Sequence, residues 1–133
     1  MLPEKVFIIR RKGRSVILTT EQENFLNESQ FVFIDLAELD IQEQILLFQN
    51  AKTIIAPHGA GLSWIFLCQE NCKIIEFNNG LFRNDCFFNI AKKINLDFTQ
   101  ITGLPAHCPE KNEDPNIIID DFAFEKLKSE LRG

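Results

Sequence analysis

Residues 53–67 read TIIAPHGAGLSWIFL, an apolar strand pattern that passes through a proline and a histidine into two glycines and an apolar helix pattern. Gly59 and Gly61 allow a sharp turn and let a ligand approach the backbone where no Cβ intervenes. A helix that begins there presents unpaired N–H groups and the positive end of its dipole, so it favours an anion. A tight turn with a half-buried, functionless histidine is the alternative. The joint occurrence of all these features favours an anion site.

Short apolar runs alternate with helix patterns on both sides of this stretch. We expect strands near residues 5–10, 31–36, 53–56, 72–77 and 97–102. We expect helices at 19–29, 40–51, from the glycine turn to about 67, at 84–95 and at 121–132. The segment 103–116 is polar and rich in proline, which indicates a loop, and 117–120 has the pattern of a short edge strand.

Two of these helices have a capping-box spacing at their start. Thr20 is expected to be the N-cap of the first helix, with Glu23 three residues on, and Asp40 that of the second, with Glu43.

Alternation of this kind describes βαβ units. It predicts one α/β domain over residues 1–133, Rossmann-like, with a mostly parallel sheet and helices on both faces. Ligands bind such sheets beyond the carboxyl ends of the strands, at a switch point in strand order. The positions of interest are therefore 10–12, 57–61 and 76–79.

The composition is that of an ordinary soluble domain, with 133 residues, 45% apolar and 25% charged. No apolar run is long enough to span a membrane, and the first residues do not resemble a signal peptide. A net charge of −5 argues against nucleic acid as a partner. The basic cluster at residues 10–14 suits one small anionic ligand instead.

Four side chains near the strand ends are candidate contacts of a ligand with an anionic group. Arg10 and Arg11 follow the first strand with side chains on opposite faces, so only one points straight into a crevice, and a solvated basic loop is the alternative. His58 can donate a hydrogen bond to a phosphate or sugar oxygen. Glu76 closes a buried strand and can accept both hydroxyls of a ribose, the alternative being a structural cap or ion pair.

Several other chemistries lack their residues. His107 and Cys108 have no second histidine nearby, and no Asp-x-Asp follows a strand, so we expect no metal and no cofactor. Ser63 lacks the Gly-x-Ser-x-Gly elbow, and no Walker A sequence is present. The four cysteines do not have zinc-ribbon spacing and are expected to be reduced thiols.

Three stretches carry a resemblance to a known family. KVFIIRRKGRSVILTTEQE, QEQILLFQNAKTIIAPHGAGLSWIFL and KIIEF, within residues 4–98, together resemble the C-terminal half of the family-61 glycosyltransferases. That group includes bacterial capsular-polysaccharide enzymes and eukaryotic enzymes that transfer N-acetylglucosamine or xylose.

The resemblance implies the nucleotide-sugar lobe of a metal-independent glycosyltransferase-B fold. Arg10 or Arg11 and the turn from His58 through Gly59, Ala60 and Gly61 would face the donor diphosphate, with Glu76 near the base or ribose. His58 would be the catalytic candidate, and no residue here is convincing as the base for the acceptor hydroxyl.

The partners implied are a nucleotide-diphosphate sugar, a glycan or protein acceptor, and an N-terminal lobe in cis or on another chain. The location implied is the cytoplasm in a bacterium or the secretory-pathway lumen in a eukaryote. A non-catalytic anion-binding module of the same fold is the alternative function.

Overall fold

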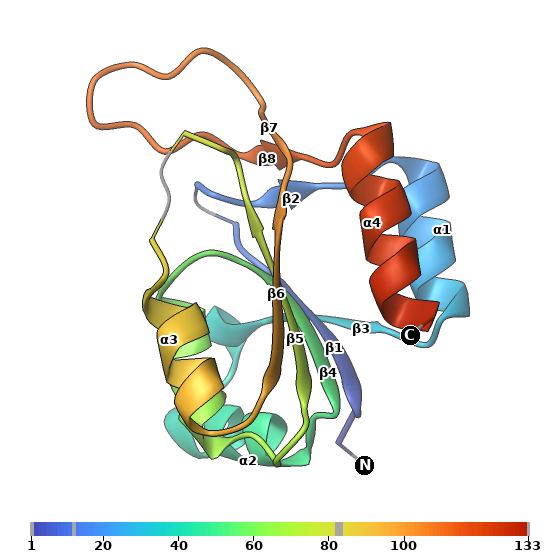
Figure 1. Cartoon of the computed structure of the whole chain (residues 1–133), viewed down its shortest axis with the longest axis vertical. Coiled ribbons are helices and arrows are strands. Elements are labelled where there is room, and N and C mark those ends of the chain that lie inside the picture. The colour runs from blue at the N-terminus through green and yellow to red at the C-terminus, as the bar shows by residue number, and fades with distance from the viewer. Residues whose placement is uncertain (1, 12, 82–83, 133) are drawn as a thin grey trace.

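The computed structural model describes residues 2–11, 13–81 and 84–132 (Figure 1). Five strands form the main sheet: β1 (Lys5–Ile9), β3 (Val32–Asp35), β4 (Thr53–Pro57), β5 (Lys73–Asn78) and β6 (Asp97–Thr102). Four α-helices and two 3-10 helices connect or cover them: α1 (Thr20–Glu28), η1 (Leu36–Glu38), α2 (Ile41–Asn50), η2 (Ala60–Leu67), α3 (Cys86–Lys93) and α4 (Asp121–Arg132). All five predicted strands are confirmed, whereas the helix after the glycine turn is of the 3-10 type.

The main sheet is parallel throughout, in the order β3-β1-β4-β5-β6. When only the five strands of this sheet are numbered in chain order, the order is 2-1-3-4-5, which is that of flavodoxin-like sheets. The direction of winding reverses between β1 and β4, so the switch point lies where these two strands end. The predicted α/β class with a parallel sheet is confirmed.

Side-chain alternation along the strands divides the core into two layers. Val6, Ile54 and Ile74 face the layer formed with α2, η2 and α3. Phe7 and Ile55 face the layer formed with α1 and α4, which lie side by side on the other face in Figure 1. Strands buried on both faces read as continuous apolar runs, which is why the sequence pattern located them.

A smaller sheet adjoins the carboxyl end of the main one. Its order is β2-β8-β7, formed by Val16–Ile17, Ile117–Ile118 and Leu104–Pro105. The segment 103–116 is therefore not entirely loop, since it begins with β7. The predicted edge strand at 117–120 is instead the central strand of this sheet, because it pairs with β2 on one side and β7 on the other.

The helix starts agree with the predictions at α2 and differ at α1. Asp40 caps α2 in a capping box with Glu43, as predicted. At α1 the N-cap is Thr19, whose hydroxyl accepts from the N–H of Gln22 while the Gln22 side chain accepts from the Thr19 N–H. The expected Thr20 is the first residue inside the helix.

No helix in the described part of the chain is both long and apolar enough to cross a bilayer.

Candidate functional site

The glycine turn lies at the carboxyl end of β4, at the switch point of the sheet. The His58 N–H donates to the Phe77 carbonyl at 2.9 Å, which continues the β4–β5 pairing by one residue. The next backbone bond of this turn runs from the Leu62 N–H to the Gly59 carbonyl at 3.0 Å. The first N–H groups of a helix have no partner within it. The N–H groups of residues 59–61 are therefore the ones that η2 leaves for a ligand.

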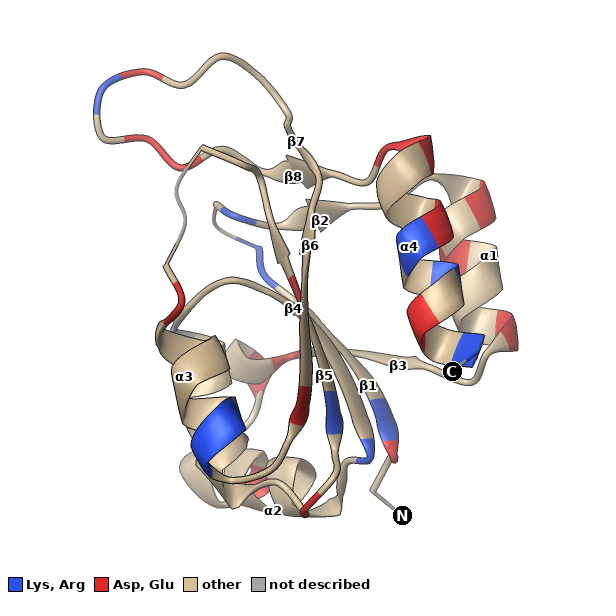
Figure 2. Ribbon diagram, in the orientation of Figure 1, with Lys and Arg blue, Asp and Glu red and all other residues tan. Residues whose placement is uncertain are grey.

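Two arginine side chains converge on Gly59. A Cβ built on this glycine would lie 2.9 Å from Arg10 Nη1 and 3.8 Å from Arg14 Cζ. Arg14 lies 3.7 Å from the carboxylate of Asp114, whereas no carboxylate within the described residues forms an ion pair with Arg10. Figure 2 shows this basic segment between β1 and β2 at the carboxyl end of the sheet.

The electrostatics of Arg10 favour an anion. Partial burial and then the charge of Arg14 hold the pKa of Arg10 below its ordinary value, while Asp114 acts in the opposite direction. Two like charges beside one buried glycine repel each other. A bound anion between them would relieve that repulsion and use the N–H groups of the turn.

Arg11 lies at the same edge of the sheet but is already paired with carboxylates. Its Nε donates to Asp35 at 2.9 Å and its Nη2 to Glu38 at 3.1 Å, so both of its ion pairs are with the end of β3 and η1. The two side chains diverge, Arg10 toward Gly59 and Arg11 toward Asp35 and Glu38, but both line the cavity at this edge of the sheet. The prediction that only one arginine of the pair faces a crevice is therefore not confirmed.

His58 is held from behind by a buried carboxylate. Its Nδ1 lies 2.9 Å from Glu76 Oε2, and its ring packs against Phe87 with centroids 5.2 Å apart. Glu76 is 1% exposed, and its second oxygen accepts from Gln100 Nε2 at 3.0 Å. In the tautomer in which Nδ1 donates to this oxygen, Nδ1 carries the hydrogen. Nε2 is then the nitrogen free to meet a ligand.

The predicted contact between Glu76 and a ribose does not fit this geometry. The carboxylate has a protein partner on each oxygen and is almost completely buried. Glu76 is instead placed to hold the imidazole ring of His58 in one orientation.

A cavity of about 480 Å³ opens between the ends of β1, β3 and β4. Arg10, Arg11 and Asp35 supply its charged groups, and Gly59 and Gly61 form one wall. The remaining lining is mainly apolar: Ile8, Ile9, Leu36, Ala37, Ala56, Pro57 and Leu62. Its volume falls within the range of small-molecule sites, and an apolar cavity beside a few convergent polar groups is typical of them.

Three residues of this region were missed by sequence reasoning about the site. Arg14 belongs to the basic cluster, but only the turn between β1 and β2 brings it back over Gly59. Gln100 and Asp114 reach the site from β6 and from the segment before β8. No sequence signal could have found Gln100 or Asp114, because Gln100 meets Glu76 only through the register of β5 and β6.

The described residues contain no cluster of three or more histidine, cysteine or carboxylate side chains able to hold a metal. His107 pairs with Glu113 in the exposed loop at 2.8 Å. All four cysteines are free thiols, with Cys68 and Cys72 partly or fully buried and Cys86 and Cys108 exposed.

An α/β domain with a glycine turn and two arginines at its switch point defines a broad class of protein, and comparison with known proteins narrows that class. The profile of the glycosyltransferase 61 family matches residues 2–75, more than half of the chain. A beta-1,2-xylosyltransferase of Arabidopsis thaliana is 30% identical over 94 residues, covering 71% of this chain and 16% of that protein. The chain belongs to glycosyltransferase family 61.

A likeness among solved structures concerns the fold alone. A flavodoxin-like domain from Synechococcus sp. matches with a TM-score of 0.59 at 16% identity, covering 95% of this chain and 91% of that one.

Proposed function

We propose that this chain is the donor-binding lobe of a family-61 glycosyltransferase and binds the diphosphate of a nucleotide-diphosphate sugar. The observation that carries this is the convergence of Arg10 and Arg14 on Gly59, where the N–H groups of residues 59–61 precede the first bond of η2. The adjoining cavity of about 480 Å³ receives the uncharged parts of the donor. The family membership supports glycosyl transfer as the reaction.

The diphosphate meets two guanidinium groups and the backbone N–H groups of the turn in this arrangement. The guanidinium of Arg10 has no competing ion pair in the described structure, and Arg14 exchanges its 3.7 Å contact with Asp114 for the phosphate. Guanidinium groups form paired hydrogen bonds to phosphate oxygens. Backbone N–H groups at the start of η2 complete the contacts, as at other helix N-termini that bind phosphate.

The same groups favour the transfer step. Breaking the bond from sugar to diphosphate places negative charge on the leaving phosphate oxygen. Preformed donors aimed at that oxygen stabilise the charge as it develops, each by about 3 kcal/mol. A metal ion is not needed for this role where two arginines and several N–H groups supply it, which supports a metal-independent mechanism.

His58 is the catalytic residue in this proposal, and Glu76 is its positioning residue. The bond of 2.9 Å from Nδ1 to Glu76 fixes the ring, so Nε2 is presented to the leaving group or the transferred sugar. Glu76→Gln keeps the shape of this pair and removes its charge, so turnover should fall more than donor binding.

A second lobe is part of the proposal. The chain spans 16% of the length of the xylosyltransferase relative. A glycosyltransferase-B enzyme closes two lobes around the donor, and the base that deprotonates the acceptor hydroxyl would come from the facing lobe. The acceptor is a glycan or a protein hydroxyl. In a bacterium, the enzyme would act in capsular polysaccharide synthesis in the cytoplasm. In a eukaryote, it would act in the secretory-pathway lumen.

Calorimetry with uridine diphosphate and guanosine diphosphate, in buffer containing EDTA, tests the proposal. One lobe supplies part of the donor contacts, so we expect a Kd of about 0.1 to 1 mM for one of the two, equivalent to about −5.5 to −4 kcal/mol. The matching nucleoside without phosphates is the control and should bind at least about tenfold more weakly. Equal binding of nucleoside and diphosphate, or binding that requires magnesium, would contradict the proposal.

A further inference from the structure

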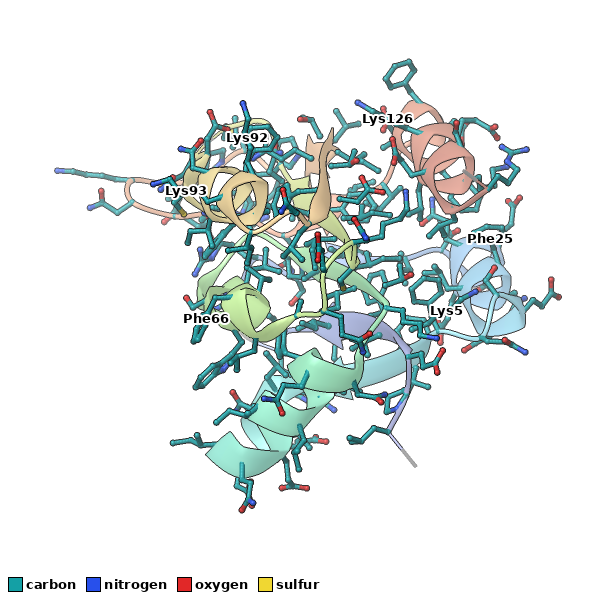
Figure 3. All side chains as sticks on the ribbon, turned by 60° about the horizontal axis from the view of Figure 1, so that its bottom comes forward. Lys5, Phe25, Phe66, Lys92, Lys93 and Lys126 are labelled. Atoms are coloured by element: carbon teal, nitrogen blue, oxygen red, sulfur yellow. The ribbon has the colours of Figure 1, made fainter. Side chains whose placement is uncertain are left out.

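A separate cavity of about 400 Å³ lies along β6, which is the last strand of the main sheet and pairs only with β5 in the described structure. It extends from Phe88 of α3, across Phe98, Gln100 and Thr102 of β6, to Lys126 of α4. Figure 3 shows β6 between these two helices, with Lys126 on the flank of α4 that faces the strand. We propose that this cavity binds a sugar ring of an uncharged oligosaccharide.

The polar side chains of the cavity are held in place from inside the fold. Gln100 donates its Nε2 to Glu76 at 3.0 Å, which leaves its carbonyl oxygen to accept. Asn78 accepts from the Gly80 N–H at 2.9 Å through Oδ1, which leaves its NH₂ group to donate. Thr99 donates to Glu130 at 3.2 Å and still has lone pairs to accept. Donors and acceptors fixed before binding lose little entropy when a ligand arrives.

These groups match the chemistry of a pyranose. Each sugar hydroxyl both donates and accepts, and the wall offers an amide NH₂, an amide carbonyl and threonine hydroxyl groups. The ring of Phe88 is 39% exposed and stands edge-on to Phe98, with centroids 6.0 Å apart. An exposed aromatic ring beside polar groups suits the C–H face of a sugar, which is apolar.

Charge and pre-organisation favour a sugar in this cavity over an anionic ligand and over an added peptide strand. None of the lining residues is a carboxylate, and Lys126 is the single cation among them, so the cavity lacks the clustered charge of the turn at Gly59. A peptide strand added to β6 would use the backbone edge and would gain nothing from side-chain amides fixed by Glu76 and Gly80. The observations therefore favour a sugar.

This inference goes beyond the donor site and does not depend on it. The two sites are joined through Gln100 and Glu76, which bind each other and hold His58. A saccharide on β6 would thus lie behind the residue proposed to act on the donor.

Amide chemical shifts of the ¹⁵N-labelled chain test the proposal, with cellotriose, maltotriose, mannotriose and chitotriose as probes at millimolar concentration. We expect at least one of the four to shift the amides of residues 98–102 and Phe88 along a saturable curve. Phe88→Ala should weaken that binding at least about fivefold. Phe122→Ala is the matched control, since Phe122 is also exposed but does not line the cavity, and it should bind like the unchanged chain.

Three results would overturn the inference. The first is the absence of saturable shifts on β6 with all four trisaccharides, and the second is an unchanged Kd in Phe88→Ala. The third is concentration-dependent broadening of β6 without any sugar, which would assign this edge to strand addition by a second copy. If Phe88→Ala does not fold, Thr102→Val takes its place, with the same expected loss. Nucleotide binding is measured separately, from the chemical shifts of the Gly59 and Gly61 amides. Failure of the donor site would therefore leave those two amides unshifted and would not affect the shifts on β6.

Discussion

Replacing Gly59 with alanine should weaken nucleotide-diphosphate binding while leaving the fold intact. Gly59 has φ 161° and ψ 179°, an extended conformation that alanine adopts without strain. The new Cβ would lie 2.9 Å from Arg10 Nη1, too close to be tolerated, so the guanidinium must move. The displaced atom is the end of a flexible side chain, and we expect the free energy of unfolding to change by less than about 1 kcal/mol.

The expected loss of binding follows from the hydrogen bonds that the displaced guanidinium makes. A hydrogen bond to a charged group contributes about 1.5 to 3 kcal/mol. Losing the lower figure raises Kd about tenfold. Calorimetry with the diphosphate that binds better measures the change, and thermal unfolding checks the fold.

A double-variant cycle shows whether the effect passes through Arg10. If the alanine acts by displacing this side chain, Gly59→Ala added to Arg10→Ala should cost little more than Arg10→Ala alone. Full-strength binding by Gly59→Ala, or two losses that simply add, would refute the reasoning.

Three further predictions concern other parts of the chain. Arg10→Ala should raise the Kd for the diphosphate at least about tenfold. Arg11→Ala should change the Kd little, because Arg11 is already paired with Asp35 and Glu38. Equal losses of affinity in parallel titrations of the two variants would contradict this prediction. Thr19→Ala should lower the free energy of unfolding by about 1 kcal/mol, because Thr19 is the N-cap of α1. Thr20→Ala should lower it by less than half of that, and urea unfolding of the two variants measures the difference. The exposed thiols of Cys86 and Cys108 should react rapidly with a thiol reagent and those of Cys68 and Cys72 only on denaturation, since the latter are shielded; four fast thiols, or fewer than four after denaturation, would show otherwise.

The strands and the switch point were predictable from sequence because both depend on local patterns. Apolar runs such as KVFII and KIIEF are buried on both faces of a parallel sheet, and a proline and glycines mark the end of β4. The strand ends, and with them the edge of the sheet where we expect a ligand, follow from these signals.

The details of the site were not predictable, since they depend on contacts between distant segments. Arg14 lies in a short turn without periodicity, so nothing in the sequence indicates that it lies over Gly59. The burial of Glu76 between His58 and Gln100 depends on the register of β4, β5 and β6, which the sequence does not specify. At α1, two adjacent threonines are each followed three residues later by a glutamine or a glutamate, and the local pattern cannot choose between them.

A crystal structure of this chain with its bound nucleoside diphosphate tests the central claim most directly. We predict that the two phosphates lie within hydrogen-bonding distance of the Arg10 guanidinium and the N–H groups of residues 59–61, with the nucleoside extending into the adjoining cavity. Phosphates bound instead at the opposite end of the sheet, where Lys5, Lys73, Lys128 and Arg132 line a cavity of about 300 Å³, would contradict the account.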